Sequence, residues 1–287
     1  MEIKYLTEHY IPNDVLCRED QLTEIFTQIE NFKRFGKGTN YVVHGRTGTG
    51  KTLLLKHICN TSGFFIYTNV LQDKTSIRIL KSISGGNLKH QSDMINSILK
   101  EFNENPKGII IDEIDRLYPY GFKELMGNLN YIYRETQIPI IVSTNQSIGS
   151  FYRQLPEDAR LTLFFRELNL PPYTNEELYM ILQQRLGSAE IHFEESSKLL
   201  LTAIASKEGS ARLLLNMAYD CYLEQDFSES NVIKVFRRYS AKQDVDYIME
   251  NTNGTEKQVL RAILSLNNSD NNDNINSASL FKLLNIS

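Results

Sequence analysis

Eight consecutive residues place three glycines, a lysine and a threonine in the order that binds nucleotide phosphates. They read Gly45-Arg46-Thr47-Gly48-Thr49-Gly50-Lys51-Thr52 and stand between an apolar run and an amphipathic stretch. Glycine lets backbone N–H groups turn towards phosphate oxygens, and the first turn of the following helix adds its dipole. We therefore expect all eight residues to bind the phosphates of ATP or ADP, with Lys51 on the β- and γ-phosphates and Thr52 on Mg²⁺.

Two adjacent carboxylates end a later apolar run. Ile109-Ile110-Ile111 predicts a buried strand, and Asp112 and Glu113 follow it directly. At the end of such a strand, Asp112 can hold the Mg²⁺ shell, and Glu113 can take a proton from a water that attacks the γ-phosphate. Glu113 therefore favours a Mg²⁺-dependent ATP hydrolase over a protein that only binds nucleotide.

A third polar position follows a further apolar run, residues 139–144. Asn145 stands at the carboxyl end of this predicted strand, and ligands of open α/β sheets bind beyond that edge. Its amide can orient the attacking water or touch the γ-phosphate. Asparagine at a strand end also caps turns, so its position alone leaves both roles open.

The composition is that of an ordinary globular protein. Hydrophobic residues make up 41% of the 287 positions and charged residues 23%, which is enough apolar material for two domains. The net charge of −4 excludes a global basic field, so any contact with DNA has to come from a local patch. The N-terminus is too polar for a signal peptide, and no apolar run has the length of a membrane span. The sequence therefore predicts a cytoplasmic protein without a membrane partner.

The elements that must position these residues alternate up to about residue 168. Apolar runs predict strands over 40–44, 63–69, 108–112 and 139–145, and amphipathic stretches predict helices over 51–60, 75–84, 90–102 and 120–135. Nearly continuous apolar strands separated by helices imply a parallel sheet covered on both faces. The expected fold class is therefore α/β, with three αβα layers.

After Pro171-Pro172 the strand pattern stops and helical spacing continues. Helices are predicted over 174–186, 196–207, 210–224 and 228–238, which implies a separate small helical domain. Further helices are expected over 244–249, 255–266 and 279–284, with a polar Asn/Asp/Ser loop over 267–276.

The phosphate loop, the acid pair, the strand-end Asn145 and the helical domain together resemble an AAA+ ATPase. Finer features, within about residues 9–265, are similar to the archaeal origin-recognition-complex/cell-division-control replication initiators. They are Tyr10-Ile11-Pro12 with Leu16–Glu19, Asp112–Leu117, Leu170–Tyr173 and Glu208–Arg212. The resemblance implies a P-loop AAA+ domain over residues 1–170, a helical lid domain over 171–241 and an incomplete winged helix over 242–287.

The resemblance also implies roles for particular residues. Tyr10 and Ile11 are expected near the adenine, and Arg212 is the expected second sensor at the γ-phosphate. Arg160 is the candidate that acts on a neighbouring subunit's nucleotide in a homo- or hetero-oligomer. The alternatives for this role are Arg153 and Arg166, and each of the three can also be a solvated surface charge. The sequence departs from the family at Gln146, where an acid more usually follows the sensor asparagine.

The implied function is a slow ATP switch that acts on DNA and on a replicative helicase or another protein at the nucleoid. No wing follows the last predicted helix, so we expect weak duplex binding with little sequence preference, near ~10⁻⁴–10⁻⁶ M. Two alternatives remain open: a nucleotide-switched signalling or regulatory ATPase without a DNA role, and a transposition helper ATPase. The net charge of −4 favours the regulator, whereas the N-terminal segment and the lid junction favour the initiator.

Overall fold

A parallel sheet is the centre of the fold. The computed structural model describes residues 3–118 and 120–250, and within them five strands form one sheet in the order β2-β3-β4-β1-β5. The strands are β1 (Tyr41–His44), β2 (Phe65–Asn69), β3 (Gly108–Asp112), β4 (Ile140–Thr144) and β5 (Arg166–Asn169). All the paired strands run parallel, so their carboxyl ends lie at the same edge.

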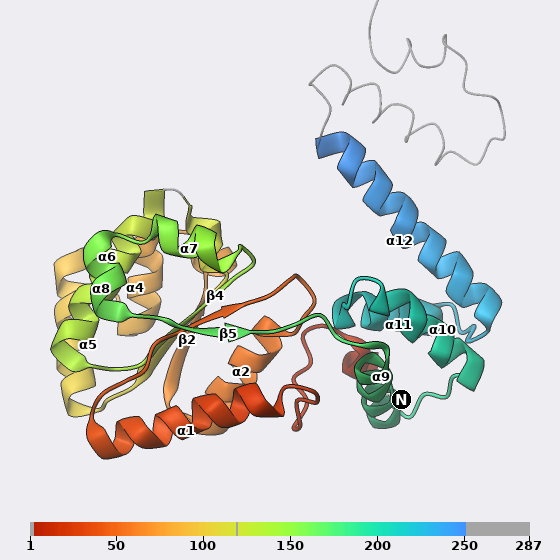
Figure 1. Cartoon of the computed structure of the whole chain (residues 1–287), viewed down its shortest axis with the longest axis horizontal. Helices are drawn as coiled ribbons and strands as arrows, with labels where there is room; N and C mark the ends of the chain where they lie inside the picture. Colours follow the sequence, from red (N-terminus) through yellow and green to blue (C-terminus); the bar gives the residue numbers. More distant parts are fainter. Residues whose placement is uncertain (1–2, 119, 251–287) are drawn as a thin grey trace, which may run out of the picture. The chain divides into compact units, whose positions relative to one another are not determined.

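Alternate residues of these strands bury opposite faces of the sheet, because side chains alternate along a strand. Ile110 and Ile141 pack with α1 (Glu19–Phe35) and α2 (Lys51–Ser62) on one face. Ile109, Ile111 and Val142 pack on the other face, in one apolar core with residues of the next set of helices. These are α4 (Ser76–Ser84), α5 (Gln91–Glu104), α6 (Tyr120–Thr136), α7 (Ile148–Gln154) and α8 (Glu157–Leu163). Figure 1 shows the resulting three αβα layers.

A helical region follows β5. It consists of α9 (Asn175–Ala189), α10 (Glu195–Ser206) and α11 (Ala211–Leu223). α9 starts with a capping box, in which Thr174 and Glu177 each satisfy the other's backbone N–H. The short 3₁₀ helix η1 (Ile3–Leu6) contacts both α9 and α11, so the N-terminus of the described chain packs on this helical region.

The chain separates into two compact units, Met1–Glu229 and Ser230–Ser287. The described part of the second unit lies in α12 (Glu229–Glu250), a single helix where separate helices over 228–238 and 244–249 were expected. The expected helices over 255–266 and 279–284, the polar loop between them and most of the expected winged helix lie outside the described residues. The domain boundaries expected at residues 170 and 241 stay predictions.

The four predicted strands are confirmed, and the structure adds elements that the sequence pattern did not predict. β5 presents only Leu168 to the core, so it has no apolar run to reveal it. α1, the short helix α3 (Val70–Asp73), and the short helices α7, α8 and η2 (Ile114–Leu117) were also missed. In residues 3–118 and 120–250, no helix combines the length and the apolar character that crossing a membrane requires.

Candidate functional site

A cavity of about 310 Å³ lies at the carboxyl ends of the strands. Its lining includes the phosphate loop after β1, Asn69 of β2, Glu113 after β3 and Asn145 after β4. The opposite wall comes from the N-terminal segment before α1 and from helices α9 and α11. Residues of this wall include Glu8, His9, Pro12, Val15, Leu16, Ile181, Gln184, Arg185, Arg212 and Leu215.

The phosphate loop needs glycine at several of its positions, and residues 48 and 50 are two of them. Gly48 and Gly50 have φ angles of 87° and 91°, in the left-handed region that side chains disfavour. A Cβ on Gly48 would come within 2.1 Å of Ser210 Oγ, and one on Gly50 within 2.6 Å of Tyr173 Oη. Gly50 is also the N-cap of α2 and offers no side-chain cap. The N–H groups of the first turn of α2 are therefore available to an anion.

Lys51 is held by the loop that it follows. Its Nζ donates hydrogen bonds to the carbonyl oxygens of Gly45, at 2.7 Å, and Arg46, at 3.0 Å. The side chain is buried and lines the cavity. Burial lowers the pKa of Lys51, and the nearby Asp112 carboxylate counteracts this effect. A phosphate would give this ammonium an anionic partner in place of neutral carbonyls.

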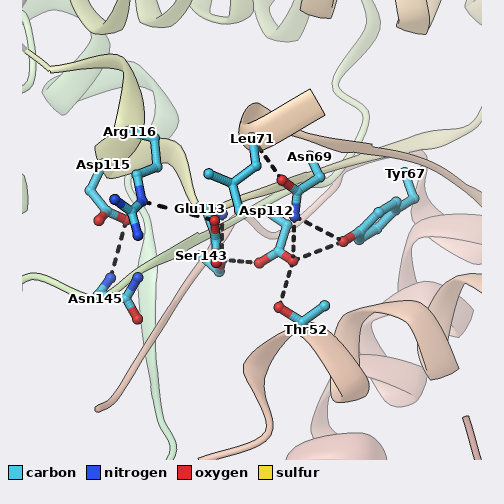
Figure 2. Close-up of polar contacts among 10 residues, drawn as sticks. All are labelled: Thr52, Tyr67, Asn69, Leu71, Asp112, Glu113, Asp115, Arg116, Ser143 and Asn145. Carbon is cyan, nitrogen blue, oxygen red and sulfur yellow. Dashed lines mark hydrogen bonds and ion pairs between the residues drawn. The ribbon is translucent and has the colours of Figure 1, made fainter. Parts of the chain in front are cut away.

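Asp112 is fully buried and accepts hydrogen bonds from side chains of two other strands, β2 and β4, and of helix α2 (Figure 2). Thr52 Oγ1 and Tyr67 Oη each donate to its Oδ2 at 2.8 Å, and Asn69 Nδ2 donates at 3.1 Å. Ser143 Oγ donates to Oδ1. A buried carboxylate needs such donors because burial removes its water. The network fixes the orientation of the Asp112 carboxylate.

The oxygen atoms of Thr52 and Asp112 form a donor set that suits Mg²⁺. The hydroxyl and the carboxylate oxygen lie 2.8 Å apart, and both are hard oxygen ligands. Magnesium keeps several waters and needs few protein ligands beside nucleotide phosphates. The residues present therefore fit a metal ion bound between this pair and a phosphate chain.

Glu113 follows β3 in a left-handed backbone conformation, with φ 59° and ψ 44°. Its backbone N–H donates to Ser143 Oγ at 2.8 Å. Its Oε2 is buried and accepts no hydrogen bond from the described residues, and Arg116 Nε lies 4.0 Å away. Burial raises the pKa of Glu113, Asp112 raises it further and Arg116 opposes both effects. A carboxylate in this state is suited to accept a proton.

Asn145 lines the cavity beyond the end of β4. Its backbone N–H donates a hydrogen bond to Oδ1 of Asp115 at 3.2 Å, and its side-chain amide takes no part in this bond (Figure 2). Arg212, at the start of α11, also lines the cavity and forms an ion pair of 2.8 Å with Glu8. The structure therefore brings Lys51, Glu113, Asn145 and Arg212 to one cavity.

Tyr10 and Ile11, which were expected near the adenine, lie outside the described cavity lining. Tyr10 lies under the guanidinium of Arg185, 4.8 Å from ring centroid to Cζ, and its carbonyl accepts a hydrogen bond from Arg185 Nη1 at 3.3 Å. Among the described residues it is Glu8, His9 and Pro12 that line the cavity here, rather than Tyr10 or Ile11.

The three arginines considered for action on a neighbouring subunit also lie away from the described cavity lining. Arg160 Nη2 donates to the carbonyl of Leu155 at 3.2 Å. A residue that serves another subunit's nucleotide need not line its own cavity, so the choice among Arg153, Arg160 and Arg166 stays a prediction.

Sequence reasoning missed residues that hold the site together. Arg18 is 2% exposed and donates to the carbonyls of Cys17, Thr49 and Pro171 at 2.7, 3.2 and 2.8 Å. It therefore ties α1 to the phosphate loop and to the junction before α9. Tyr67 and Asn69 of β2 were missed as partners of Asp112. The polar residues Tyr67, Thr68 and Asn69 at the end of a predicted strand were the available signal for this pair.

The order β2-β3-β4-β1-β5, with a phosphate loop after β1 and an acid pair after β3, is typical of P-loop AAA+ proteins. Residues 41–171 match the family described as "ATPase family associated with various cellular activities (AAA)".

Among AAA+ proteins, the chain resembles the archaeal ORC/Cdc-type replication initiators. It is 26% identical over 234 residues to an ORC1-type DNA replication protein 1 of Sulfurisphaera tokodaii and 28% identical over 234 residues to one of Sulfolobus acidocaldarius. Each alignment covers 74% of this chain and 58% of the relative, so the chain spans less than two thirds of their length.

Solved structures show the same fold. The Aeropyrum pernix ORC1 protein in complex with DNA gives a TM-score of 0.70 at 22% identity, covering 99% of this chain and 80% of that one. The Aeropyrum pernix ORC2 protein, in ADPNP-ADP complexes, gives 0.71 at 20% identity, covering 98% of this chain and 82% of that one.

Proposed function

We propose that this chain binds ATP with Mg²⁺, hydrolyses it slowly and uses the two nucleotide states as a switch in the initiation of DNA replication. The observation that carries the proposal is the hydrogen bond of 2.8 Å between Thr52 and Asp112. It joins the phosphate loop to the acid pair at the cavity that Lys51 and Glu113 also line.

Each residue has a task in this proposal. Thr52 and Asp112 hold Mg²⁺, which, when bound, neutralises charge on the phosphates. Lys51 binds the β- and γ-phosphates through its ammonium, and the backbone N–H groups of Gly45–Thr52 bind the phosphate oxygens. Glu113 accepts the proton of the attacking water, and Asn145 orients that water. Arg212 contacts the γ-phosphate from the other wall.

The switch follows from the composition of the cavity walls. ATP contacts both the phosphate loop and α11, and its γ-phosphate interacts with Arg212 only before hydrolysis. A ligand shifts a conformational equilibrium by its difference in affinity for the two states. Loss of the γ-phosphate removes that difference, so hydrolysis resets the arrangement of the helical region.

Two findings support the replication role. The relatives are ORC1-type DNA replication proteins, and the Aeropyrum pernix ORC1 protein, which has a similar fold, was solved in complex with DNA. We propose duplex DNA and a replicative helicase or another protein as partners, at the nucleoid. We further propose an oligomer in which Arg160, or alternatively Arg153 or Arg166, reaches a neighbour's nucleotide.

Two measurements test the proposal. Phosphate release from ATP should require Mg²⁺ and stop when EDTA is added, whereas hydrolysis that persists in EDTA would contradict the metal assignment. A titration with duplex DNA at several salt concentrations should show affinity that falls steeply with salt, because phosphate contacts release counterions. A chain that hydrolyses ATP but shows no DNA binding at low salt would favour the regulatory ATPase without a DNA role.

A further inference from the structure

An acid from the N-terminal segment faces the cation at the phosphate end of the cavity. Glu8 Oε2 lies 2.8 Å from Arg212 Nε, and both residues line the cavity. The two side chains remain 43% and 47% exposed, so a ligand in the cavity can reach both.

Arg212 is placed at the phosphate end by its own helix. The backbone N–H of Ala211 donates to the carbonyl of Gly48 at 3.1 Å, which joins the first turn of α11 to the phosphate loop. The Arg212 charge also acts on the catalytic groups: burial is the main cause of the lowered pKa of Lys51, and Arg212 lowers that pKa further. Arg212 likewise opposes the effect of burial on the pKa of Glu113.

The two cations of this end have different partners. Lys51 is held by carbonyl oxygens of the loop itself, which are neutral. Arg212 is held by a carboxylate of a separate segment. A γ-phosphate that approaches Arg212 meets the negative charge of Glu8 and must share or replace it. A nucleoside diphosphate has no γ-phosphate to make this exchange.

We propose that Glu8 is a specificity-determining residue that competes with the γ-phosphate for Arg212 and so limits the preference of the cavity for ATP over ADP. This inference rests on the proposed function, because it takes Arg212 as the contact of the γ-phosphate.

The segment that carries Glu8 has other attachments, so a substitution at Glu8 leaves it in place. The Tyr10 carbonyl accepts from Arg185, and the Asp14 carbonyl accepts from Gln184 Nε2 at 2.9 Å. Glu8→Gln keeps the length and shape of the side chain and removes its charge. This variant therefore tests the charge of Glu8 and not the fold of the segment.

The experiment measures the dissociation constants of ADP and of a non-hydrolysable ATP analogue by calorimetry, with Mg²⁺ present. Glu8→Gln should bind the ATP analogue about fivefold more tightly, the value of a good exposed ion pair, with a much smaller change for ADP. Glu176→Gln is the matched control, because Glu176 is an exposed acid at the start of α9 outside the described cavity lining. The double variant with Arg212→Ala should bind as Arg212→Ala alone does.

Three outcomes overturn the inference. An unchanged ratio of the two dissociation constants in Glu8→Gln, with normal binding by the wild type, overturns it and leaves the proposed function intact. An equal gain for both nucleotides shows that Glu8 repels phosphates in general and does not select between them. A wild-type protein that binds neither nucleotide overturns the proposed function and the inference with it.

Discussion

The guanidinium of Arg18 lies over the ring of Tyr173, with its Cζ 3.8 Å from the ring centroid. Arg18 precedes α1 and Tyr173 precedes α9, so this contact joins two distant parts of the chain beside the phosphate loop. Burial raises the pKa of Tyr173 to about 12, which keeps the phenol neutral at physiological pH. A neutral aromatic face is a suitable partner for a buried guanidinium.

Arg18→Ala should lower both stability and nucleotide affinity. The change removes the cation–π contact and leaves the buried carbonyl of Thr49 and the partly buried carbonyl of Pro171 without this donor. We expect the free energy of unfolding to fall by about 2–4 kcal/mol, measured by chemical denaturation. Arg78→Ala, at an exposed position of α4, is the control and should change it by less than about 0.5 kcal/mol. Equal stability of the two variants would contradict the role of Arg18.

Lys51→Ala tests the phosphate loop. It removes the ammonium that the loop carbonyls hold at the cavity, so ATP affinity should fall at least tenfold, or about 1.4 kcal/mol. Calorimetric titration measures this change, with the exposed Lys81→Ala on α4 as the control. Ordinary ATP binding by Lys51→Ala would show that the loop has been assigned wrongly.

Glu113→Gln separates binding from chemistry. Glutamine keeps the size and the hydrogen-bonding capacity of the side chain but cannot accept the proton. We expect ATP to bind as in the wild type while turnover falls by about a hundredfold, measured by phosphate release. If hydrolysis is unchanged where the wild-type rate is measurable, Glu113 is a structural acid.

The hydrolysis rate should depend on pH through Glu113. Because burial and then Asp112 raise its pKa, the proton-accepting carboxylate forms at higher pH than for an ordinary glutamate, so the rate should rise with pH. Arg116 lowers this pKa, so Arg116→Gln should move the acid limb of the kcat profile to higher pH. The same profile measured for Arg78→Gln should coincide with that of the wild type. An acid limb that does not move in Arg116→Gln would remove Glu113 as its origin.

The phosphate loop and the acid pair could be predicted because each is a contiguous stretch with its own chemistry. The strands before them could be predicted as well, because both faces of a parallel sheet are buried and the sequences of its strands are therefore nearly all apolar. β5 has the sequence Arg166-Glu167-Leu168-Asn169 and buries only Leu168, so no apolar run predicts it. It is a strand at the edge of the sheet because it pairs with β1.

The partners of Asp112 depend on strand order, which the sequence pattern does not contain. Asn69 pairs with Asp112 in the register of β2 and β3, and this proximity exists only because β2 is the neighbour of β3. Arg18 was unpredictable for a related reason. From sequence alone, a single arginine is predicted to lie on the surface. Only the fold places the carbonyls of Thr49 and Pro171 within hydrogen-bonding distance of it.

Tyr67→Phe tests whether this missed network tunes the metal site. Tyr67 Oη donates to the same Oδ2 of Asp112 that accepts from Thr52 and Asn69, and burial raises the pKa of Tyr67 so that the phenol stays a donor. Phenylalanine keeps the ring and removes only that hydrogen bond.

Partners that orient a metal ligand typically contribute about tenfold or more in metal affinity. The Mg²⁺ concentration for half-maximal hydrolysis should therefore rise about tenfold, with ATP affinity measured without metal unchanged. Tyr152→Phe is the matched control, because its hydroxyl donates to the carbonyl of Phe165 instead. An unchanged Mg²⁺ requirement in Tyr67→Phe would mean that Thr52 and Asn69 alone fix Asp112.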